Sequence, residues 1–349
     1  MIIDGRPISA SEPPYVIAEI SANHGQDEDA AHALVIAAAE AGADAVKLQH
    51  YTPDTITVRS DHPDFVVRGG TLWDGTQLAD LYAEAMTPWA WTEALVETAR
   101  QAGITWFSSP FDNSAVDFLE PFNPAAYKIA SAELVDLPLI RYVASQGRPM
   151  IMSTGMATLA EIDAAVTAAQ SAGATDIALL RCSSAYPAPV GEIDLAVIPD
   201  MAERWSRPIG FSDHTLGTTA SIVAVALGAC VIEKHLIMDR ADGGPDSAFS
   251  IEPAELRELI AAVRDAHAAR GIIRYGPSES ELASLAFRRS LRAVRPIAAG
   301  ESFTADNVRS IRPAGGLAPD EIGSVIGQVA EHDLMQGAPI TQADIRSAT

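Results

Sequence analysis

Eight short apolar segments alternate with longer, alanine-rich segments, and this alternation limits the folds open to the chain more than any other feature. The apolar segments are residues 15–20, 44–49, 105–109, 126–131, 149–154, 177–182, 208–214 and 231–236. Several of the intervening segments end on a glycine, which is typical of a helix C-terminus. Alternating strands and helices favour a parallel sheet, and eight such units in about 275 residues match a closed (β/α)8 barrel in number and length. An open, doubly wound sheet is the alternative.

Nearly every predicted strand ends in polar side chains. In a barrel these ends meet on one face, where active sites are built, so the acid, ammonium, imidazole and hydroxyl groups predict a site there. The main polar residues at these ends are Glu19, Lys47, Gln49, Ser109, Lys128, Ser131, Ser153, Ser212, His214, Glu233 and His235. A long segment, 52–82, follows the second predicted strand, and we expect it to shape the substrate pocket.

Lysine is rare in this chain. Of the 24 basic residues only Lys47, Lys128 and Lys234 are lysines, and each lies in an apolar segment. A compact ammonium group suits a phosphate or carboxylate ligand in a crowded pocket. Because side chains alternate along a strand, Lys234 faces away from Glu233 and His235 and toward the helices. We therefore predict that Lys47 and Lys128 bind an anion, and that Lys234 pairs with a carboxylate.

Two histidines end neighbouring strands of the predicted barrel. His214 and His235 would lie about 5 Å apart at the backbone, so they could share a divalent cation whose open positions hold a carbonyl and a water. Glu19 is the best candidate for acid or base chemistry, because it ends an apolar strand where burial would favour the neutral carboxyl group.

The pattern of the chain changes after Gly271. We expect a barrel domain over 1–275, a linker over 276–287 and a small, β-rich domain over 288–349. The small domain has a marginal core at about 60 residues, so docking on another surface would stabilise it. It is also rich in arginine.

Composition narrows the class of protein. The formal net charge of −22 disfavours nucleic acid and anionic membranes as partners. The N-terminus lacks the features of a signal peptide, and no apolar run is long enough to span a bilayer. Cys182 and Cys230 lie in apolar segments, which is typical of reduced core thiols. We expect a cytoplasmic protein that acts on small molecules.

Ten short motifs resemble the sialic acid synthase family, whose products are nonulosonic acids. They are IAEISANHGQ, GADAVKLQHYTPDTIT, FSSPFD, YKIASAE, MSTGMAT, LLRCSSAYP, IGFSDHT, VIEKH, FRRSL and IRPAGG. The resemblance covers nearly the whole chain. It implies a (β/α)8 TIM barrel followed by an antifreeze-protein-like (SAF) domain, and an enzyme that joins phosphoenolpyruvate to an N-acylated amino sugar with release of phosphate. It also implies a domain-swapped homodimer in which each small domain caps the partner's active site.

The same resemblance assigns roles to single residues. It places phosphoenolpyruvate on Lys47, Ser109, Lys128, Ser131, Ser153, Ser184 and Ser212. It places the sugar on Gln49, Glu133, Tyr186 and Asp246, with Arg312 reaching in from the other subunit. His214 and His235 would hold manganese or magnesium. With the metal polarising the sugar aldehyde, C3 of phosphoenolpyruvate attacks it, water adds at C2 and phosphate leaves by C–O cleavage, while Glu19 manages the protons.

Within the family, SDHPDFVVRGGTLWDG and LADLYAEAMTPWAW most resemble the pseudaminic acid synthases, which use 2,4-diacetamido-2,4,6-trideoxy-altrose. Asp246 and Ser247 in GGPDSAFS fit the family's sugar loop, although the sialic acid branch shares GGPD. Ser184 stands where sialic acid synthases tend to carry asparagine, which supports another nonulosonate. Arg181 stands where many members have histidine, and the sequence offers no interpretation of it.

Other functions remain open at this point. An N-acetylneuraminate synthase would use N-acetylmannosamine, and a legionaminate synthase would use a diacetamido-trideoxy-mannose. A more distant alternative is an aldolase of the same fold, with Lys128 or Lys47 forming a Schiff base in a desolvated pocket. A non-catalytic glycan-binding protein is a different class, and the full set of polar strand ends argues against it.

Overall fold

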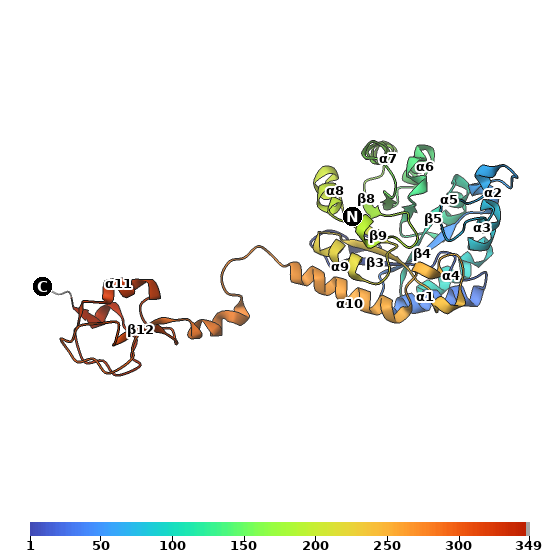
Figure 1. The fold of residues 1–349 in the computed structure, drawn as a ribbon. Coiled ribbons are helices and arrows are strands. Elements are labelled where there is room, and N and C mark those ends of the chain that lie inside the picture. Colours follow the sequence, from blue (N-terminus) through green and yellow to red (C-terminus); the bar gives the residue numbers. More distant parts are fainter. Residues whose placement is uncertain (347–349) are drawn as a thin grey trace. The chain divides into compact units, whose positions relative to one another are not determined.

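The chain forms two compact units. The computed structural model describes residues 1–346, and the first unit is Met1–Gly271, with the second beginning at Ile272. Figure 1 shows the first unit as a barrel of strands surrounded by helices, and the second as a small unit of short strands and helices.

The first unit is a closed barrel of eight parallel strands, in the order β10-β3-β4-β5-β6-β7-β8-β9 around the ring. This confirms the predicted barrel and excludes the open sheet. The strands are β3 (Tyr15–Glu19), β4 (Ala45–His50), β5 (Thr105–Pro110), β6 (Tyr127–Ile129), β7 (Met150–Ser153), β8 (Ile177–Cys182), β9 (Ile209–Asp213) and β10 (Val231–His235). An antiparallel hairpin of β1 (Ile2–Ile3) and β2 (Arg6–Pro7) precedes them.

Helices alternate with the strands and cover the outside of the barrel. They are α1 (Glu28–Ala41), α4 (Thr92–Ala102), α5 (Asn113–Leu119), α6 (Leu137–Ser145), α7 (Leu159–Ser171), α8 (Val197–Trp205), α9 (Thr219–Ala226) and α10 (Pro253–Arg270). Local signals set their ends. For example, Asp27 accepts hydrogen bonds from the first turn of α1, and Gly42 ends that helix with a φ of 89°.

Two apolar layers hold the barrel together, and strand alternation separates them. On β3, Val16 and Ala18 pack outward in the layer between strands and helices. Tyr15 and Ile17 point inward and pack with side chains such as Phe107 in the barrel interior. Glu19 continues this inward series at the C-terminal end of the strand. The same alternation aims the polar strand ends into the mouth of the barrel.

The long segment after β4 adds structure above this mouth. It contains α2 (Pro53–Ile56), a 3-10 turn at Pro63–Phe65, α3 (Leu78–Ala85) and a second 3-10 turn at Trp89–Trp91. The indole N–H of Trp73 donates to the carbonyl of Pro245 at 3.0 Å, so the segment is tied to the loop after β10.

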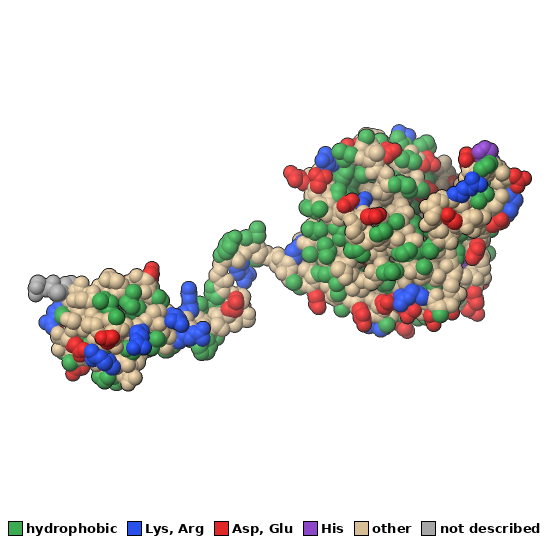
Figure 2. Space-filling model, in the orientation of Figure 1, with side chains coloured by type: hydrophobic (Ala, Val, Ile, Leu, Met, Phe, Trp, Pro, Cys, Tyr) green, Lys and Arg blue, Asp and Glu red, His purple; other side chains and the backbone are tan. Residues whose placement is uncertain are grey.

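The second unit has its own small core. It contains a 3-10 helix at Glu279–Phe287, β11 (Ser290–Ala293), β12 (Val308–Ile311), α11 (Ile322–Val325), β13 (Val329–Ala330) and β14 (Ile345–Arg346). Leu291, Phe303 and Val325 are among its buried apolar side chains. Basic side chains gather on this unit in Figure 2, whereas acidic ones are spread over the barrel. From Ile272 onward eight arginines face nine acidic residues, so nearly all of the net charge of −22 belongs to the barrel.

No helix within residues 1–346 is both long enough and apolar enough to cross a membrane.

Candidate active site

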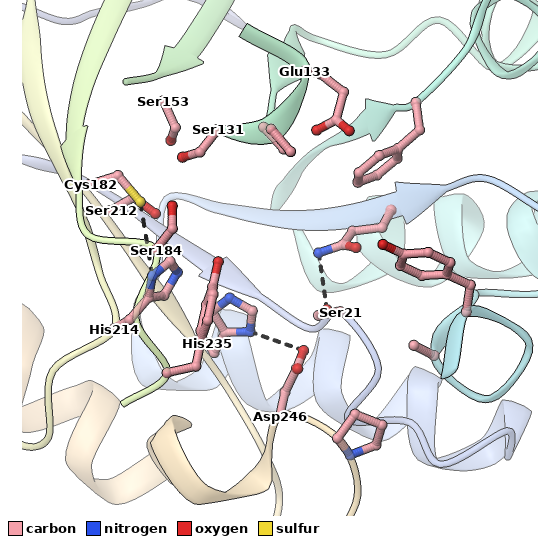
Figure 3. A pocket seen from close by; sticks show the side chains of 18 of the residues that line it. Ser21, Ser131, Glu133, Ser153, Cys182, Ser184, Ser212, His214, His235 and Asp246 are labelled. Atoms are coloured by element: carbon pink, nitrogen blue, oxygen red, sulfur yellow. Dashed lines mark hydrogen bonds and ion pairs between the residues drawn. The ribbon is translucent and has the colours of Figure 1, made fainter. Parts of the chain in front are cut away.

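A cavity of about 430 Å³ opens at the C-terminal ends of the strands. Twelve of the predicted site residues line it, because parallel strands bring their ends to one face of the barrel. They are Lys47, Gln49, Lys128, Ser131, Glu133, Ser153, Ser184, Tyr186, Ser212, His214, His235 and Asp246. Figure 3 shows the serine hydroxyls and the two imidazoles directed into this shared space.

The floor of the cavity is a buried network of two lysines and two carboxylates. Lys47 Nζ lies 2.7 Å from Glu19 Oε2 and 3.0 Å from Glu233 Oε2. Lys128 Nζ lies 3.6 Å from Glu233 Oε1 and donates to Ser153 Oγ at 2.7 Å. Glu233 therefore bridges both ammonium groups, and the four charges cancel when no ligand is bound.

This network shifts the pKa values of its members. Burial alone would lower the pKa of Lys47, but Glu19 and Glu233 outweigh it, so that pKa is raised. For Lys128 burial prevails over the attraction of Glu233 and lowers the pKa to about 8. Burial would raise the pKa of Glu233, yet the two ammonium groups hold it well below its usual range. The two lysines therefore differ, since only Lys128 loses its charge in weakly alkaline solution.

Glu19 has surroundings that differ from the expected apolar strand end. Its carboxylate is buried, pairs with Lys47 and accepts a hydrogen bond from the Ser21 N–H at 2.7 Å. The carboxyl group is desolvated as expected, but its surroundings are not purely apolar, because an ammonium group from β4 lies beside it. Glu19 is also not among the residues that line the cavity, so it contacts the site through Lys47.

The serine hydroxyls form a second group along the cavity wall. Ser184 Oγ and Ser109 Oγ are buried and have no hydrogen-bond partner within the described residues. Ser184 lines the cavity, whereas Ser109 does not and pairs with Gln49 in the β4–β5 ladder. Gly155 has a φ of +34°, and a Cβ there would lie 2.4 Å from Ser131 Cβ and 2.8 Å from Ser184 Oγ. The backbone after β7 thus closely approaches the hydroxyl groups.

The two histidines lie side by side, with ring centroids 5.3 Å apart. His214 Nδ1 donates to the carbonyl oxygen of Ser183 at 2.8 Å. Because a carbonyl only accepts, this bond fixes the tautomer of the neutral ring and leaves Nε2 free of a proton. His235 Nδ1 lies 3.4 Å from Asp246 Oδ2, and the Tyr186 ring packs on His214 at 4.4 Å.

The donor set fits a divalent metal held by two imidazoles. The orientation of His214 by a backbone carbonyl is the outer contact that metal-binding histidines commonly have. Within residues 1–346 no group of three or more His, Cys, Asp or Glu side chains is arranged as a metal site. His214 and His235 are the side chains that would hold such an ion.

The structure also shows the surroundings of the residues predicted to hold the sugar. Gln49 Nε2 donates to Ser21 Oγ at 3.0 Å. Glu133 Oε2 is buried without a hydrogen-bond partner among the described residues, and burial raises the pKa of this carboxyl group. Burial would raise the pKa of Asp246, but its contact with His235 lowers it overall. Arg312 lies exposed in the second unit, just after β12.

Lys234 and Arg181 point away from the cavity. Lys234 Nζ lies 3.1 Å from Asp213 Oδ2 and donates to the Thr215 carbonyl, as predicted for a lysine that faces the helices. Arg181 donates to the carbonyl oxygens of Ile193 at 2.9 Å and Gly155 at 3.4 Å. The guanidinium of Arg181 therefore joins the loop after β8 to the loop after β7, which is the interpretation that the sequence lacked.

Sequence reasoning missed several residues of the cavity. Cys182 was expected in the core, but it lines the cavity, with Sγ 3.9 Å from His214 Nδ1. Its alternation with the outward-facing Arg181 was a usable signal. Glu233 was noted only as a polar strand end, and its bridging position depends on two other strands. Trp73, whose ring lies 5.5 Å from that of Tyr186, comes from a segment without regular periodicity.

The chain is therefore a two-domain protein. It has one barrel with a charged, hydroxyl-rich cavity, followed by a small β-rich unit. Residues 34–275 match the model of the NeuB family, and residues 288–346 match that of the SAF domain. The chain belongs to the NeuB family.

Several of its relatives are named as synthases. A pseudaminic acid synthase from Campylobacter jejuni is 40% identical over 95% of this chain and 96% of its own length. The pseudaminic acid synthase of Helicobacter pylori is 39% identical over 96% of this chain and 98% of its own length. An N,N'-diacetyllegionaminic acid synthase from Legionella pneumophila is 34% identical over 96% of this chain and 95% of its own length. Among solved structures, the N-acetylneuraminic acid synthetase of Leptospira borgpetersenii has a TM-score of 0.73 and 29% identity, covering 82% of this chain and 94% of its own.

Proposed function

We propose that this protein condenses phosphoenolpyruvate with 2,4-diacetamido-2,4,6-trideoxy-altrose to make pseudaminic acid and release phosphate. The observation that carries the proposal is one cavity in which two buried lysines and a row of hydroxyls meet a pair of imidazoles. The relatives named as pseudaminic acid synthases support the choice of product. A legionaminate or N-acetylneuraminate synthase is the alternative within the same family.

Phosphoenolpyruvate is assigned to the floor of the cavity. Lys47 and Lys128 bind its phosphate and carboxylate groups, and Ser131, Ser153, Ser184 and Ser212 add hydroxyl donors. Because Glu233 bridges both ammonium groups, the ligand competes with this carboxylate for the Nζ atoms. Ser109 is assigned to the same site, although its hydroxyl does not line the cavity.

His214 and His235 would hold the divalent ion, manganese or magnesium. When bound, that ion would supply Lewis-acid polarisation of the sugar aldehyde. Lys47 and Lys128 keep phosphoenolpyruvate below the aldehyde, so that C3 of phosphoenolpyruvate reaches it. Water then adds at C2, and phosphate leaves by C–O cleavage. Glu19, which accepts the hydrogen bond of Lys47, manages the protons of the reaction.

The sugar is assigned to the upper part of the cavity. Glu133 Oε2, which has no hydrogen-bond partner within residues 1–346, suits an N–H or O–H of the sugar, and Gln49, Tyr186 and Asp246 supply further polar contacts. The domain over 288–349, joined to the barrel domain by a linker over 276–287, is proposed to bring Arg312 to the site of a second copy in a domain-swapped homodimer. We propose a cytoplasmic location, with both cysteines free.

Phosphate release with different sugars tests the proposal. The purified protein should release phosphate from phosphoenolpyruvate with the diacetamido-trideoxy-altrose, and mass spectrometry should show the nine-carbon product. N-acetylmannosamine and the diacetamido-trideoxy-mannose should react at least about 100-fold more slowly, since a site built for particular polar contacts rejects sugars that leave them unpaired. Equal rates would refute the pseudaminic assignment.

The same assay tests the metal. Treatment with a chelator should abolish phosphate release, and added Mn²⁺ or Mg²⁺ should restore it. Activity that survives chelation but is lost on borohydride treatment with substrate would instead indicate a lysine Schiff base.

A further inference from the structure

Helix α3 turns its apolar face toward the cavity rather than toward the core. Leu78, Leu81, Tyr82 and Ala85 line the cavity, and this spacing puts them on one face of the helix. Only Ala79 of the helix is buried. An apolar helix face in a soluble protein is normally packed against other protein, so the empty space beside this one suits a ligand with an apolar group.

The helix lies at the upper end of the cavity. Lys47, Gln49 and Tyr51 line one side of it at alternate positions, and each step of two residues rises about 6.6 Å along a strand. Lys47 belongs to the charged floor, whereas the Tyr51 ring packs on those of Tyr82 and Phe111 at 5.7 and 5.0 Å. The cavity therefore passes from a charged floor to an apolar upper wall.

This wall also lies away from His214, whereas His235 on β10 is two strands from β4. In the strand order of the barrel, β4 and β5 lie across the ring from β8 and β9. Tyr51 and Phe111 directly follow β4 and β5, whereas His214 follows β9. On the proposed function, the sugar aldehyde lies near the imidazoles. The opposite end of the sugar, its last carbon, then extends toward α3.

We propose that Leu78 and Leu81 on α3, together with Val67, select a sugar whose last carbon is a methyl group over one that carries a hydroxyl there. Val67 lines the same cavity. A hydroxyl placed against these side chains loses its hydrogen bonds to water without replacement, whereas a methyl group gains apolar contacts. An apolar pocket discriminates against an added hydroxyl by about 100-fold at most. The inference rests on the proposed function and adds the residues that determine specificity.

Two sugars that differ only at C6 test the inference. They are 2,4-diacetamido-2,4,6-trideoxy-altrose and its counterpart with a C6 hydroxyl. The wild-type protein should prefer the deoxy sugar in kcat/KM by roughly 10-fold to 100-fold. This ratio should fall at least about tenfold in Leu78→Asn and in Leu81→Asn, because each variant offers polar partners to the hydroxyl. Leu72→Asn is the matched control, since Leu72 belongs to the same segment, is 51% exposed and does not line the cavity.

If an asparagine variant fails to fold, Val67→Thr provides a second test of the apolar wall, because threonine keeps the shape of valine. It should raise kcat/KM for the hydroxyl sugar several-fold, while Val58→Thr, at a residue 57% exposed outside the cavity, should not. A wild-type protein that treats both sugars alike, or variants that keep the wild-type ratio, would overturn the inference. Phosphate release with neither sugar would instead refute the proposed function.

Discussion

At the scale of single residues, Lys128 has the property most open to measurement. Burial lowers its pKa to about 8 in the free protein, and the pH dependence of kcat/KM reports the free protein. We expect kcat/KM for phosphoenolpyruvate to fall about tenfold per pH unit above pH 8, as the ammonium that binds the anion loses its proton. In Lys128→Arg the side chain keeps its charge, so kcat/KM should no longer fall between pH 8 and pH 9.5. The maximum kcat/KM should be lower than in the wild-type protein, since the guanidinium fork does not replace a compact ammonium.

A steady-state pH series between 6.5 and 9.5 provides the measurement. The control is the loss of phosphoenolpyruvate by itself, followed at each pH without protein. An unchanged kcat/KM of the wild-type protein up to pH 9.5 would contradict the role of Lys128.

Residue-level expectations succeeded where strand alternation decides the direction of a side chain. The three lysines illustrate this, because parity alone separates the inward Lys47 and Lys128 from the outward Lys234. The alternation does not indicate which of the inward-facing side chains contact each other. The sharing of Glu233 between two lysines and the burial of Glu19 beside Lys47 depend on four strands, β3, β4, β6 and β10, meeting at one depth. No local sequence pattern predicts these contacts between strands.

At the scale of elements, the loops after β7 and β8 depend on one outward-facing side chain. Arg181 bonds to backbone carbonyls in both loops, and Gly155, one of its partners, packs against Ser131 and Ser184. The loops would lose this link in Arg181→Ala. We expect KM for phosphoenolpyruvate to rise several-fold with a smaller change in kcat, and the free energy of unfolding to fall by about 1–3 kcal/mol.

Arg204 offers a matched control for this variant. It lies on α8 and pairs with Asp200 where both side chains are largely exposed, so Arg204→Ala should leave KM and stability nearly unchanged. Steady-state kinetics and urea unfolding of both variants measure the difference. A normal KM in Arg181→Ala would show that this side chain does not position the hydroxyl groups.

At the scale of the whole molecule, the charge is divided unevenly between the two units. The barrel carries nearly all of the net negative charge, whereas the second unit is close to neutral and rich in arginine. This contrast favours association between an acidic barrel and a less acidic second unit. It supports the proposal that Arg312 of one copy completes the site of another.

Complementation between two inactive variants tests the shared site. Arg312→Ala and His214→Ala should each lose activity alone. Their co-expression should restore about a quarter of the wild-type rate, because half of the dimers are mixed and each mixed dimer has one intact site. Phosphate release measures the recovery. Arg309→Ala, at an exposed neighbour on β12, should stay active by itself. If each chain builds its whole site alone, the mixture will remain as inactive as its components.

The sequence by itself determined the barrel, the face on which the cavity opens and twelve of the residues that line this cavity. These features follow from local patterns: the alternation of strands and helices, and the inward or outward direction of each side chain. Only the tertiary structure decided the sharing of Glu233, the link from Arg181 to Gly155 and the turn of α3 toward the cavity. Each of these depends on segments that are distant in the chain and meet only when the barrel closes.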